Sequence, residues 1–205
     1  MKILAVCIGS PEKLPGKTYK TGINKHAVKG AVIVDAEGLV GDAICNRRHH
    51  GGVDQAVYLE GSLTLDWWSR ELGYRIEPGT FGENLVIEGL DNRDIAVGDR
   101  FIAGDIVLEA TSPRIPCATL AARMRNSRFP ELYVRAARPG IYCRIIRGGT
   151  IEAEMPVEHV PFTGARVGIP EVMATLGRKL CEADRARHLA VPLHHKLRKL
   201  LETRA

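Results

Sequence analysis

Hydrophobic and polar residues alternate over several short stretches between residues 1 and 163, which is the period-two pattern of β-strands. The clearest stretch is 105–111, where Ile106, Leu108 and Ala110 occupy every second position. Because alternate side chains of a strand point to opposite faces, this pattern predicts a strand buried on one face. Similar composition predicts further strands at residues 1–8, 23–34, 97–105, 140–149 and 157–162.

A helical period appears where Leu65, Trp68 and Leu72 recur at intervals of three and four residues. The spacing predicts an amphipathic helix over 62–72, ended by Gly73, with its tryptophans in the core. Shorter helices are expected at 118–125 and 130–137, and residues 9–22, rich in proline, glycine and lysine, are expected to form an exposed loop.

The pattern changes after Gly168, where short helical segments replace strands. They are expected at 169–177, 178–186 and 192–203. In the last of them the leucines form an apolar stripe that must pack on something, whereas His194 and His195 are expected on the surface. We therefore predict a mainly β domain over 1–163 and a small helical appendage over 164–205.

Composition and charge narrow the class of protein. The 205 residues, 45% of them hydrophobic, suffice for one substantial core, and no apolar run approaches the roughly 20 residues needed to cross a bilayer. The net charge of +5 permits anionic partners, but the late basic residues alternate with leucines and only 5% of residues are aromatic. We expect neither a membrane nor a nucleic-acid partner.

The five cysteines lie at positions 7, 45, 117, 143 and 181, without close pairs. An odd, scattered set favours reduced thiols and a cytoplasmic location. Cys45, His49 and His50 suggest zinc at first sight. However, adjacent histidines on an extended segment point to opposite faces, and no second ligand pair has the spacing of a structural zinc site.

The stretch 111–117 (TSPRIPC) is the strongest chemical candidate. Its two prolines stiffen the end of the predicted strand and present Cys117 in a fixed position. Arg114 would lower the pKa of this thiol or bind an anion beside it. The alternative is that Cys117 is simply a small buried residue opening the next helix.

Two polar loops add candidate ligand contacts. The pair Gly51 and Gly52 lets backbone N–H groups approach a phosphate- or pterin-like anion. Asn84 can both donate to and accept from a heterocycle edge, or else close a turn on its own backbone. Lys25 is a candidate contact for an anion, or a solvated lysine on a strand.

Taken together, these motifs resemble the MOSC family, named after the C-terminal domain of molybdenum cofactor sulfurases. The matching pieces occur in family order over roughly residues 20 to 160, and the helical tail is similar to that of stand-alone bacterial members resembling 6-N-hydroxylaminopurine reductase. The pieces are 41–42 (GD), 50–58 (HGGVDQAVY), 79–85 (GTFGENL), 97–99 (VGD), 113–117 (PRIPC) and 140–144 (GIYCR).

The resemblance implies an antiparallel β-barrel with peripheral helices that binds molybdenum cofactor through the Cys117 thiolate. A thiolate suits a soft, high-valent metal. Pyridoxal phosphate is not expected, because the chain is too short to include the desulfurase domain of the large sulfurases. By the same resemblance the pocket is lined by Lys25, His50, Gly51, Gly52, Gln55, Asn84, Arg114 and Arg144.

Three functions follow. The first is a molybdenum-dependent reductase of small N-hydroxylated compounds such as hydroxylaminopurines, which needs an external electron-donor protein because the chain has no flavin or iron–sulfur motif. The second is a sulfur carrier with a persulfide on Cys117, which needs only an accessible low-pKa thiol. The third is a non-catalytic cofactor-binding module.

Overall fold

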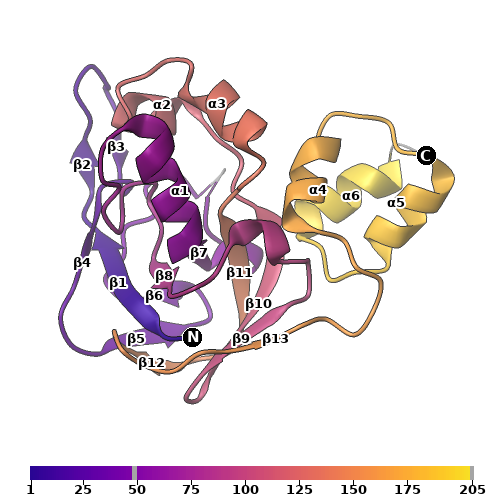
Figure 1. Ribbon diagram of the computed structural model, residues 1–205, viewed down its shortest axis with the longest axis horizontal. Helices are drawn as coiled ribbons and strands as arrows, with labels where there is room; N and C mark the ends of the chain where they lie inside the picture. Colours follow the sequence, from indigo (N-terminus) through magenta and orange to yellow (C-terminus); the bar gives the residue numbers. More distant parts are fainter. Residues whose placement is uncertain (48–49, 204–205) are drawn as a thin grey trace.

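The computed structural model describes residues 1–47 and 50–203, and it places one large sheet beside two groups of helices (Figure 1). His49, considered above for zinc, lies outside the described residues, and no helix within them has the length and apolar character of a membrane span. The elements in chain order are β1 (Ile3–Gly9), β2 (Glu12–Lys13), β3 (Lys20–Thr21), β4 (Lys25–Ala27), β5 (Val32–Asp35), β6 (Gly38–Leu39), the 3-10 helix η1 (Val53–Gln55), β7 (Val57–Gly61), α1 (Ser62–Leu72), β8 (Leu85–Ile87), the 3-10 helix η2 (Asn92–Asp94), β9 (Arg100–Ala103), β10 (Ile106–Pro113), α2 (Ala118–Arg123), α3 (Phe129–Ala136), β11 (Ile141–Arg147), β12 (Gly149–Ile151), β13 (Glu158–Val160), α4 (Ile169–Thr175), α5 (Glu182–Leu189) and α6 (His195–Thr203).

The main sheet has eight strands in the order β13-β9-β10-β11-β7-β8-β1-β4. Its neighbouring strands are antiparallel except for β7 and β8, which run parallel. Parallel neighbours need a crossover connection, and α1 with the loop after it supplies one. The sheet is therefore mixed.

The mainly β class with peripheral helices is confirmed, but the antiparallel barrel is not. Strands β13 and β4 form the two edges, and within residues 1–47 and 50–203 no strand pairing joins them into a closed barrel. Two smaller sheets, β12-β5-β6 and β2-β3, accompany the main one. The β2–β3 hairpin lies inside 9–22, so the expectation of a simple loop there was wrong: Glu12 pairs with Thr21.

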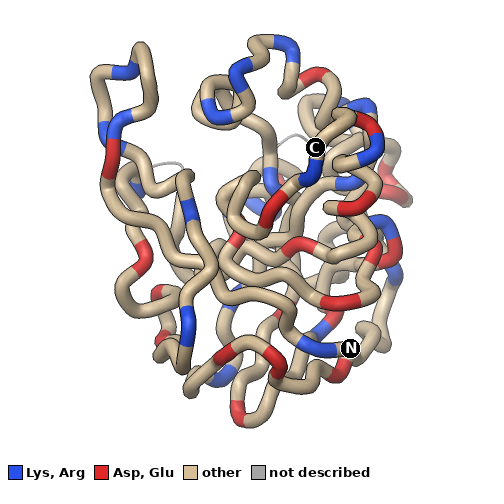
Figure 2. The backbone as a smooth tube through the Cα atoms, turned by 60° about the vertical axis from the view of Figure 1, so that its left-hand side comes forward, with Lys and Arg blue, Asp and Glu red and all other residues tan. Residues whose placement is uncertain are grey.

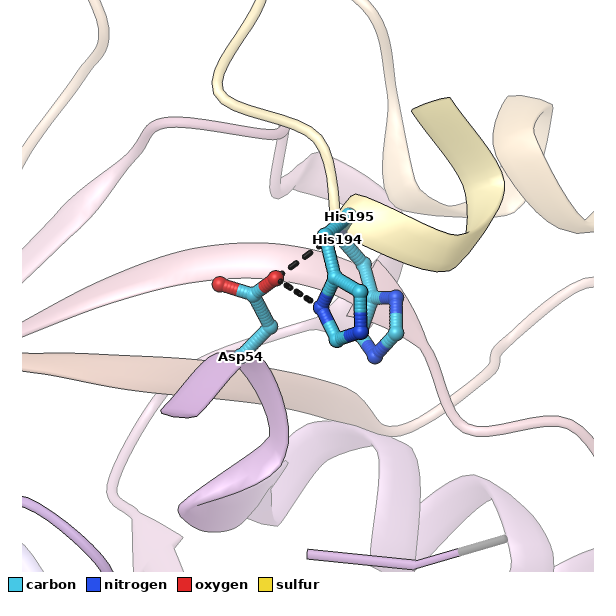
Figure 3. Close-up of side chains that lie close together, drawn as sticks. All are labelled: Asp54, His194 and His195. Atoms are coloured by element: carbon cyan, nitrogen blue, oxygen red, sulfur yellow. Dashed lines mark hydrogen bonds and ion pairs between the residues drawn. The ribbon is translucent and has the colours of Figure 1, made fainter. Parts of the chain in front are cut away.

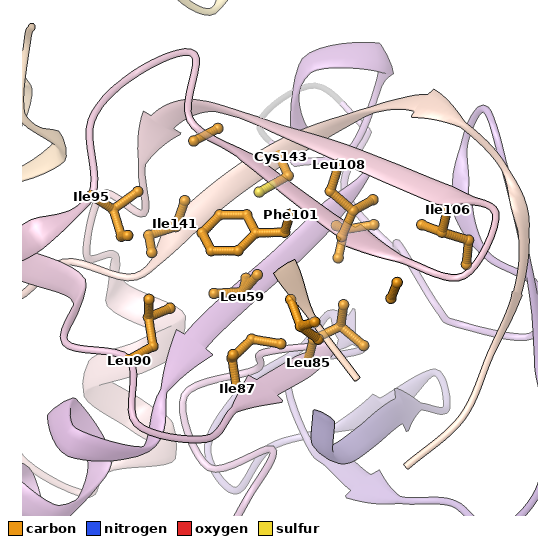
Figure 4. Packing of buried hydrophobic residues seen from close by; sticks show 14 of the residues in the cluster. Leu59, Leu85, Ile87, Leu90, Ile95, Phe101, Ile106, Leu108, Ile141 and Cys143 are labelled. Carbon is orange, nitrogen blue, oxygen red and sulfur yellow. The ribbon is translucent and has the colours of Figure 1, made fainter. Parts of the chain in front are cut away.

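Alternation along the strands divides the buried side chains between the two faces of the main sheet. On β7, Val57 and Leu59 join one apolar cluster, whereas Tyr58 between them joins the other. Figure 4 shows the first cluster, in which Phe101 lies among aliphatic side chains from several strands. Burial of a large apolar side chain contributes about 1.5–3 kcal/mol, and this cluster contains more buried residues than the second one.

The second cluster is aromatic and lies between the sheet and the helices α1 and α3. Trp68 of α1 is 2% exposed and stacks on Tyr133 of α3 at a ring distance of 5.8 Å. Phe81 and Phe129 complete the group. The predicted helix over 62–72 and the core position of Trp68 are thus confirmed. This aromatic cluster packs on the same face of the sheet as the candidate site.

The C-terminal segment is helical, with α4, α5 and α6 grouped beside the sheet (Figure 1). Its buried residues Val167, Ile169 and Leu193 belong to the same apolar cluster as the sheet. Leu197 and Leu201 of the predicted leucine stripe pack against that cluster. The helical tail is therefore packed onto the sheet core, and a domain boundary at 163/164 stays a prediction.

Candidate functional site

A cavity of about 340 Å³ lies where β10 ends and α2 begins. Its volume falls at the lower end of the range of small-molecule sites, roughly 300–1,000 Å³. Segments far apart in the sequence form its walls, including the β3 strand, the loop before β7, the loop before β8 and the start of α2. It brings together seven of the nine predicted site residues: Lys25, His50, Gly51, Gln55, Asn84, Arg114 and Cys117.

Cys117 is the N-cap residue of α2, but it is only partly buried and lines the cavity, so it is not simply a buried residue that opens the helix. Partial burial raises the pKa of its thiol. A hydrogen bond with His50, the charge of Arg114 and two backbone N–H groups at the start of α2 act in the other direction and lower that pKa to about 6. Cys117 is therefore a partly accessible thiolate at neutral pH.

Arg114 is the buried cation beside this thiolate. Its side chain is almost fully covered, with Nη1 donating to the carbonyl oxygen of Ile115 at 2.8 Å and Nη2 to Cys117 Sγ at 3.8 Å. The guanidinium also lies over the ring of Tyr133, 5.8 Å from its centroid. Burial of a cation is costly unless negative charge compensates it, so Arg114 favours an anion in the cavity.

Lys25 forms a buried ion pair with Asp42. The Lys25 ammonium contacts both carboxylate oxygens, and the two side chains are only 8% and 7% exposed, which excludes a solvated lysine. Asp42 also accepts from the backbone N–H of Gly9 at 2.8 Å. Asp42 is a cavity residue that sequence reasoning did not assign, although the 41–42 motif contained it. The pair contributes polarity to the wall without net charge.

Asn84 cross-links the strands around the cavity. Its Oδ1 accepts from the Tyr58 backbone N–H at 3.1 Å, and its Nδ2 donates to Cys7 O at 3.3 Å and to Asp42 Oδ2 at 2.9 Å. These partners lie far from residue 84 in the sequence, so the turn-closing alternative was wrong. Within the protein, the amide orders β1, β7 and the Lys25–Asp42 pair around the site.

The glycine pair before η1 adopts the left-handed backbone conformation, which glycine reaches without strain. Gly51 and Gly52 have φ values of 74° and 84°, and a Cβ at Gly51 would lie 2.9 Å from Ile44 Cδ1. Gly51 lines the cavity, whereas Gly52 does not. Gln55, at the end of η1, also lines it, and its buried Oε1 has no hydrogen-bond partner among the described residues. It offers an acceptor to a ligand.

The β2–β3 hairpin and the α2–α3 segment both contribute lining residues to the cavity and carry lysines and arginines (Figure 2), and we call these two segments its basic entrance. Tyr19 from the first segment hydrogen-bonds Thr119 from the second, Oη to Oγ1, at 3.1 Å. Clustered positive charge around a cleft attracts anions. The basic residues are Lys13, Lys17, Lys20, Arg123, Arg125 and Arg128.

Arg144, the ninth predicted site residue, does not line the cavity. It shares a strand with the cavity residue Tyr142 but points its guanidinium at Asp54, 2.8 Å from Nη2 to Oδ1, and at the carbonyl oxygen of Pro192, 3.0 Å away. The other Asp54 oxygen accepts from His195 N at 2.8 Å and His195 Nδ1 at 2.7 Å (Figure 3). Through these contacts, Arg144 and Asp54 hold the first residue of α6 against η1.

His194 lies in the same cluster and is buried, 3% exposed, so the expectation that it lies on the surface was wrong. The rings of His194 and His195 stack at 4.5 Å with 19° between their planes. An imidazole binds a metal through an in-plane lone pair, and stacked rings do not direct two such lone pairs at one point. The Arg144 guanidinium also pairs with Asp54, so we interpret this cluster as a link that holds the C-terminal segment against η1 and not as a metal site.

Cys45 and His50, which were considered as zinc ligands, both line the main cavity.

Comparison with known proteins decides the family. A model of the MOSC domain matches residues 46–158. The chain belongs to the MOSC domain family. The match contains the 50–58, 79–85, 97–99, 113–117 and 140–144 motifs and therefore most of the cavity wall. The resemblance noted in the sequence is confirmed.

Three similar proteins differ in how much of their length they share with this chain. The "Uncharacterized protein YflK" of Bacillus subtilis is 30% identical over 151 residues, 73% of this chain and 68% of YflK. "Protein YiiM" of Escherichia coli is 29% identical over 143 residues, 68% of this chain and 64% of YiiM. A Gibberella moniliformis protein named "Reductase" is 29% identical over 140 residues, 66% of this chain but 25% of that protein.

Solved structures show the same fold. YiiM from Geobacillus stearothermophilus superposes with a TM-score of 0.81 at 23% identity, covering 99% of this MOSC chain and 98% of that chain. YiiM from E. coli gives a TM-score of 0.76 at 23% identity, covering 100% and 92%. Both likenesses extend through the helical tail, so the tail is shared by these structures.

Proposed function

We propose that this MOSC protein binds molybdenum cofactor in the cavity, with Cys117 as the thiolate ligand of molybdenum, and reduces small N-hydroxylated compounds such as hydroxylaminopurines. The observation that carries the proposal is the Cys117 thiol, whose pKa is lowered to about 6 at the wall of a cavity with a basic entrance. The family match and a fungal relative named as a reductase support this class of reaction.

The donor set of the cavity fits such a group. A thiolate binds soft metals well. The buried Arg114 guanidinium and the basic entrance suit an anionic cofactor, and the unpartnered Gln55 Oε1 suits the N–H edge of a pterin. The paired Lys25 would hydrogen-bond such a ligand without adding net charge.

When bound, the cofactor would supply a metal that accepts an oxygen atom and transfers two electrons. The reaction R–NH–OH + 2 H⁺ + 2 e⁻ → R–NH₂ + H₂O requires two electrons from an external donor protein. The chain's own residues hold Cys117 ionised: His50 hydrogen-bonds the sulfur, and Arg114 balances its charge. Five free cysteines fit a reducing compartment, and we place the activity in the cytoplasm.

The proposal is tested by assaying reduction of a hydroxylaminopurine with an artificial electron donor, using protein from a molybdenum-replete host. We expect turnover in the wild type and none in Cys117→Ser. Cys45→Ser is the matched control, because Cys45 also lines the cavity but lacks the contact with Arg114. Equal turnover in Cys117→Ser and Cys45→Ser would remove the assignment.

The same low-pKa thiol also supports the sulfur-carrier alternative. Intact-protein mass spectrometry distinguishes the two. A sulfane-sulfur adduct confined to Cys117, in protein that contains no molybdenum, would favour the carrier. Bound molybdenum without turnover across several N-oxygenated substrates would favour the non-catalytic binding module.

A further inference from the structure

A fully buried carboxyl group lies directly behind the cavity wall. Glu60 of β7 is 0% exposed, and the hydroxyl of Tyr58, two residues earlier on the same strand, lies 2.6 Å from its Oε1. The other Glu60 oxygen accepts from Asn92 Nδ2. Tyr58 itself lines the cavity. One hydrogen bond therefore connects the buried carboxyl to a residue that lines the cavity.

The fold leaves space for this pair at Gly140, the first residue of the 140–144 motif. A Cβ at Gly140 would lie 2.1 Å from Tyr58 Cε2 and 2.6 Å from both Glu60 Oε1 and the Tyr58 hydroxyl. The Gly140 backbone N–H donates to the hydroxyl of Tyr133 at 2.8 Å, and that hydroxyl lies 3.4 Å from the Tyr58 hydroxyl. Any larger residue at 140 would break the Tyr58–Glu60 contact.

The surroundings keep Glu60 protonated at neutral pH. Burial raises its pKa, the nearby buried Glu83 raises it further, and hydrogen bonds from Tyr58 and Asn92 together with the charge of Arg114 lower it, for a result of about 8. Tyr133 of α3 faces the same group. Burial and Glu60 raise the pKa of Tyr58, so its hydroxyl stays neutral.

We propose that Glu60 stores a proton for the cavity and that Tyr58 passes it to the N-hydroxylated substrate. This inference rests on the proposed reductase function and supplies one of the two protons in R–NH–OH + 2 H⁺ + 2 e⁻ → R–NH₂ + H₂O. When Glu60 is protonated, its O–H donates to Tyr58 Oη, and the single hydroxyl hydrogen of Tyr58 is then free to donate to the substrate. As the N–O bond breaks, this Tyr58 O–H proton moves to the leaving oxygen. The Glu60 O–H proton moves to Tyr58 Oη, so Tyr58 remains neutral and Glu60 becomes a carboxylate.

The second proton comes from solvent water, and both electrons come from the external donor protein. After the product leaves, a solvent proton returns through Tyr58 to Glu60. In this scheme Tyr58 is the catalytic residue, because it touches the substrate. Glu60 acts through it as the residue that recharges its hydroxyl.

Infrared spectroscopy of the protein without cofactor tests the proton store independently of turnover. We expect a carboxylic-acid carbonyl band at neutral pH that disappears as the pH rises through about 8, and that is absent from Glu60→Gln. Tyr58→Phe removes the hydrogen bond and shifts the band and its midpoint. Tyr142→Phe is the matched control: Tyr142 also lines the cavity but does not contact Glu60, so the Glu60 band and its midpoint stay unchanged.

A wild-type difference spectrum against Glu60→Gln that shows only a carboxylate at pH 6 would overturn the inference. So would a Glu60 band that titrates identically in wild type and Tyr58→Phe.

Turnover of the loaded protein provides the second test. Loss of a general acid costs about a hundredfold or more in rate, so we expect Glu60→Gln and Tyr58→Phe to lower kcat about that much, with KM little changed. The limb of the kcat–pH profile near 8 should vanish in Glu60→Gln and remain in Tyr142→Phe. Turnover with an unaltered profile in Glu60→Gln would refute the proton store while leaving the reductase intact. A wild type without turnover would refute the reductase, and the infrared titration would then decide whether Glu60 exchanges its proton through Tyr58.

Discussion

The guanidinium of Arg114 lies 3.8 Å from Cys117, measured from Nη2 to Sγ, and is itself only 3% exposed. Because water screens a buried charge poorly, this cation stabilises the thiolate more strongly than a surface arginine would. The stiff 111–117 stretch holds both residues at one end of β10, where the side chain of His50 reaches the same sulfur.

The first prediction concerns the ionisation of Cys117. In cofactor-free protein with a Cys45→Ser/Cys181→Ser background, where the remaining cysteines 7 and 143 are buried, we expect the rate of alkylation of Cys117 by iodoacetamide to reach half its maximum at pH about 6. A lowered pKa means that the thiolate forms as the pH rises through this value and is nearly complete at pH 8. Samples quenched at intervals and analysed by mass spectrometry give the alkylation rate at each pH.

Variants of Arg114 and His50 test whether these two residues lower the pKa of Cys117. Arg114→Gln and His50→Asn should each move the midpoint of the alkylation profile upward, toward the ordinary cysteine pKa of about 8.5. A wild-type midpoint already near 8.5 would contradict the electrostatic account of the site.

A second prediction concerns the buried pair of Lys25 and Asp42. Asp42→Asn leaves the Lys25 charge uncompensated and removes an acceptor of the Asn84 amide, so we expect the free energy of unfolding to fall by about 3–5 kcal/mol. Urea denaturation measures this. The exposed pair of Arg47 and Glu37 is the control, and Glu37→Gln should cost no more than about 1 kcal/mol. Similar losses in the two variants would show that the Lys25–Asp42 pair does not support the cavity wall.

The third prediction concerns the link between the C-terminal segment and η1. Burial raises the pKa of Asp54, but hydrogen bonds from His195 and the charge of Arg144 outweigh that effect and lower it. A group whose pKa is lower in the folded state stabilises the fold above its unfolded pKa of about 3.9, and this contribution is lost as the pH falls through the folded value. Wild-type stability should therefore decline more steeply than that of Asp54→Asn below pH about 4. Thermal unfolding at several pH values measures both dependences. If the stability of wild type and Asp54→Asn falls equally with pH, Asp54 does not link the C-terminal segment to η1 in this way.

The local parts of the fold could be predicted from the sequence, because they depend on periodicity. The helix over 62–72 and the strand leading to Cys117 follow from spacing alone. The sequence could not predict that β8 runs parallel to β7, because parallel and antiparallel strands have the same period of two. The last helix was expected to begin at residue 192, but α6 begins at His195, whose backbone N–H donates to Asp54.

The sequence predicted most of the cavity-lining residues named for the site but not the residues behind them. Cys117, Arg114, Asn84 and Asp42 stand in recognisable motifs. The contacts of Asp42 with Asn84 and of Glu60 with Asn92 depend on the fold, because these partners lie 42 and 32 residues apart in the sequence. Glu60 did leave a signal, since a single glutamate interrupts an otherwise apolar strand. A charge at such a position is buried only where the fold supplies polar partners.

The molybdenum content of freshly isolated protein shows directly whether Cys117 holds the metal. Protein from a molybdenum-replete host, analysed by elemental mass spectrometry, should contain close to one molybdenum per chain in the wild type and in Cys45→Ser, and almost none in folded Cys117→Ser. Equal molybdenum in Cys117→Ser and the wild type, or none in any of the three, would contradict the assignment of Cys117 as the metal ligand.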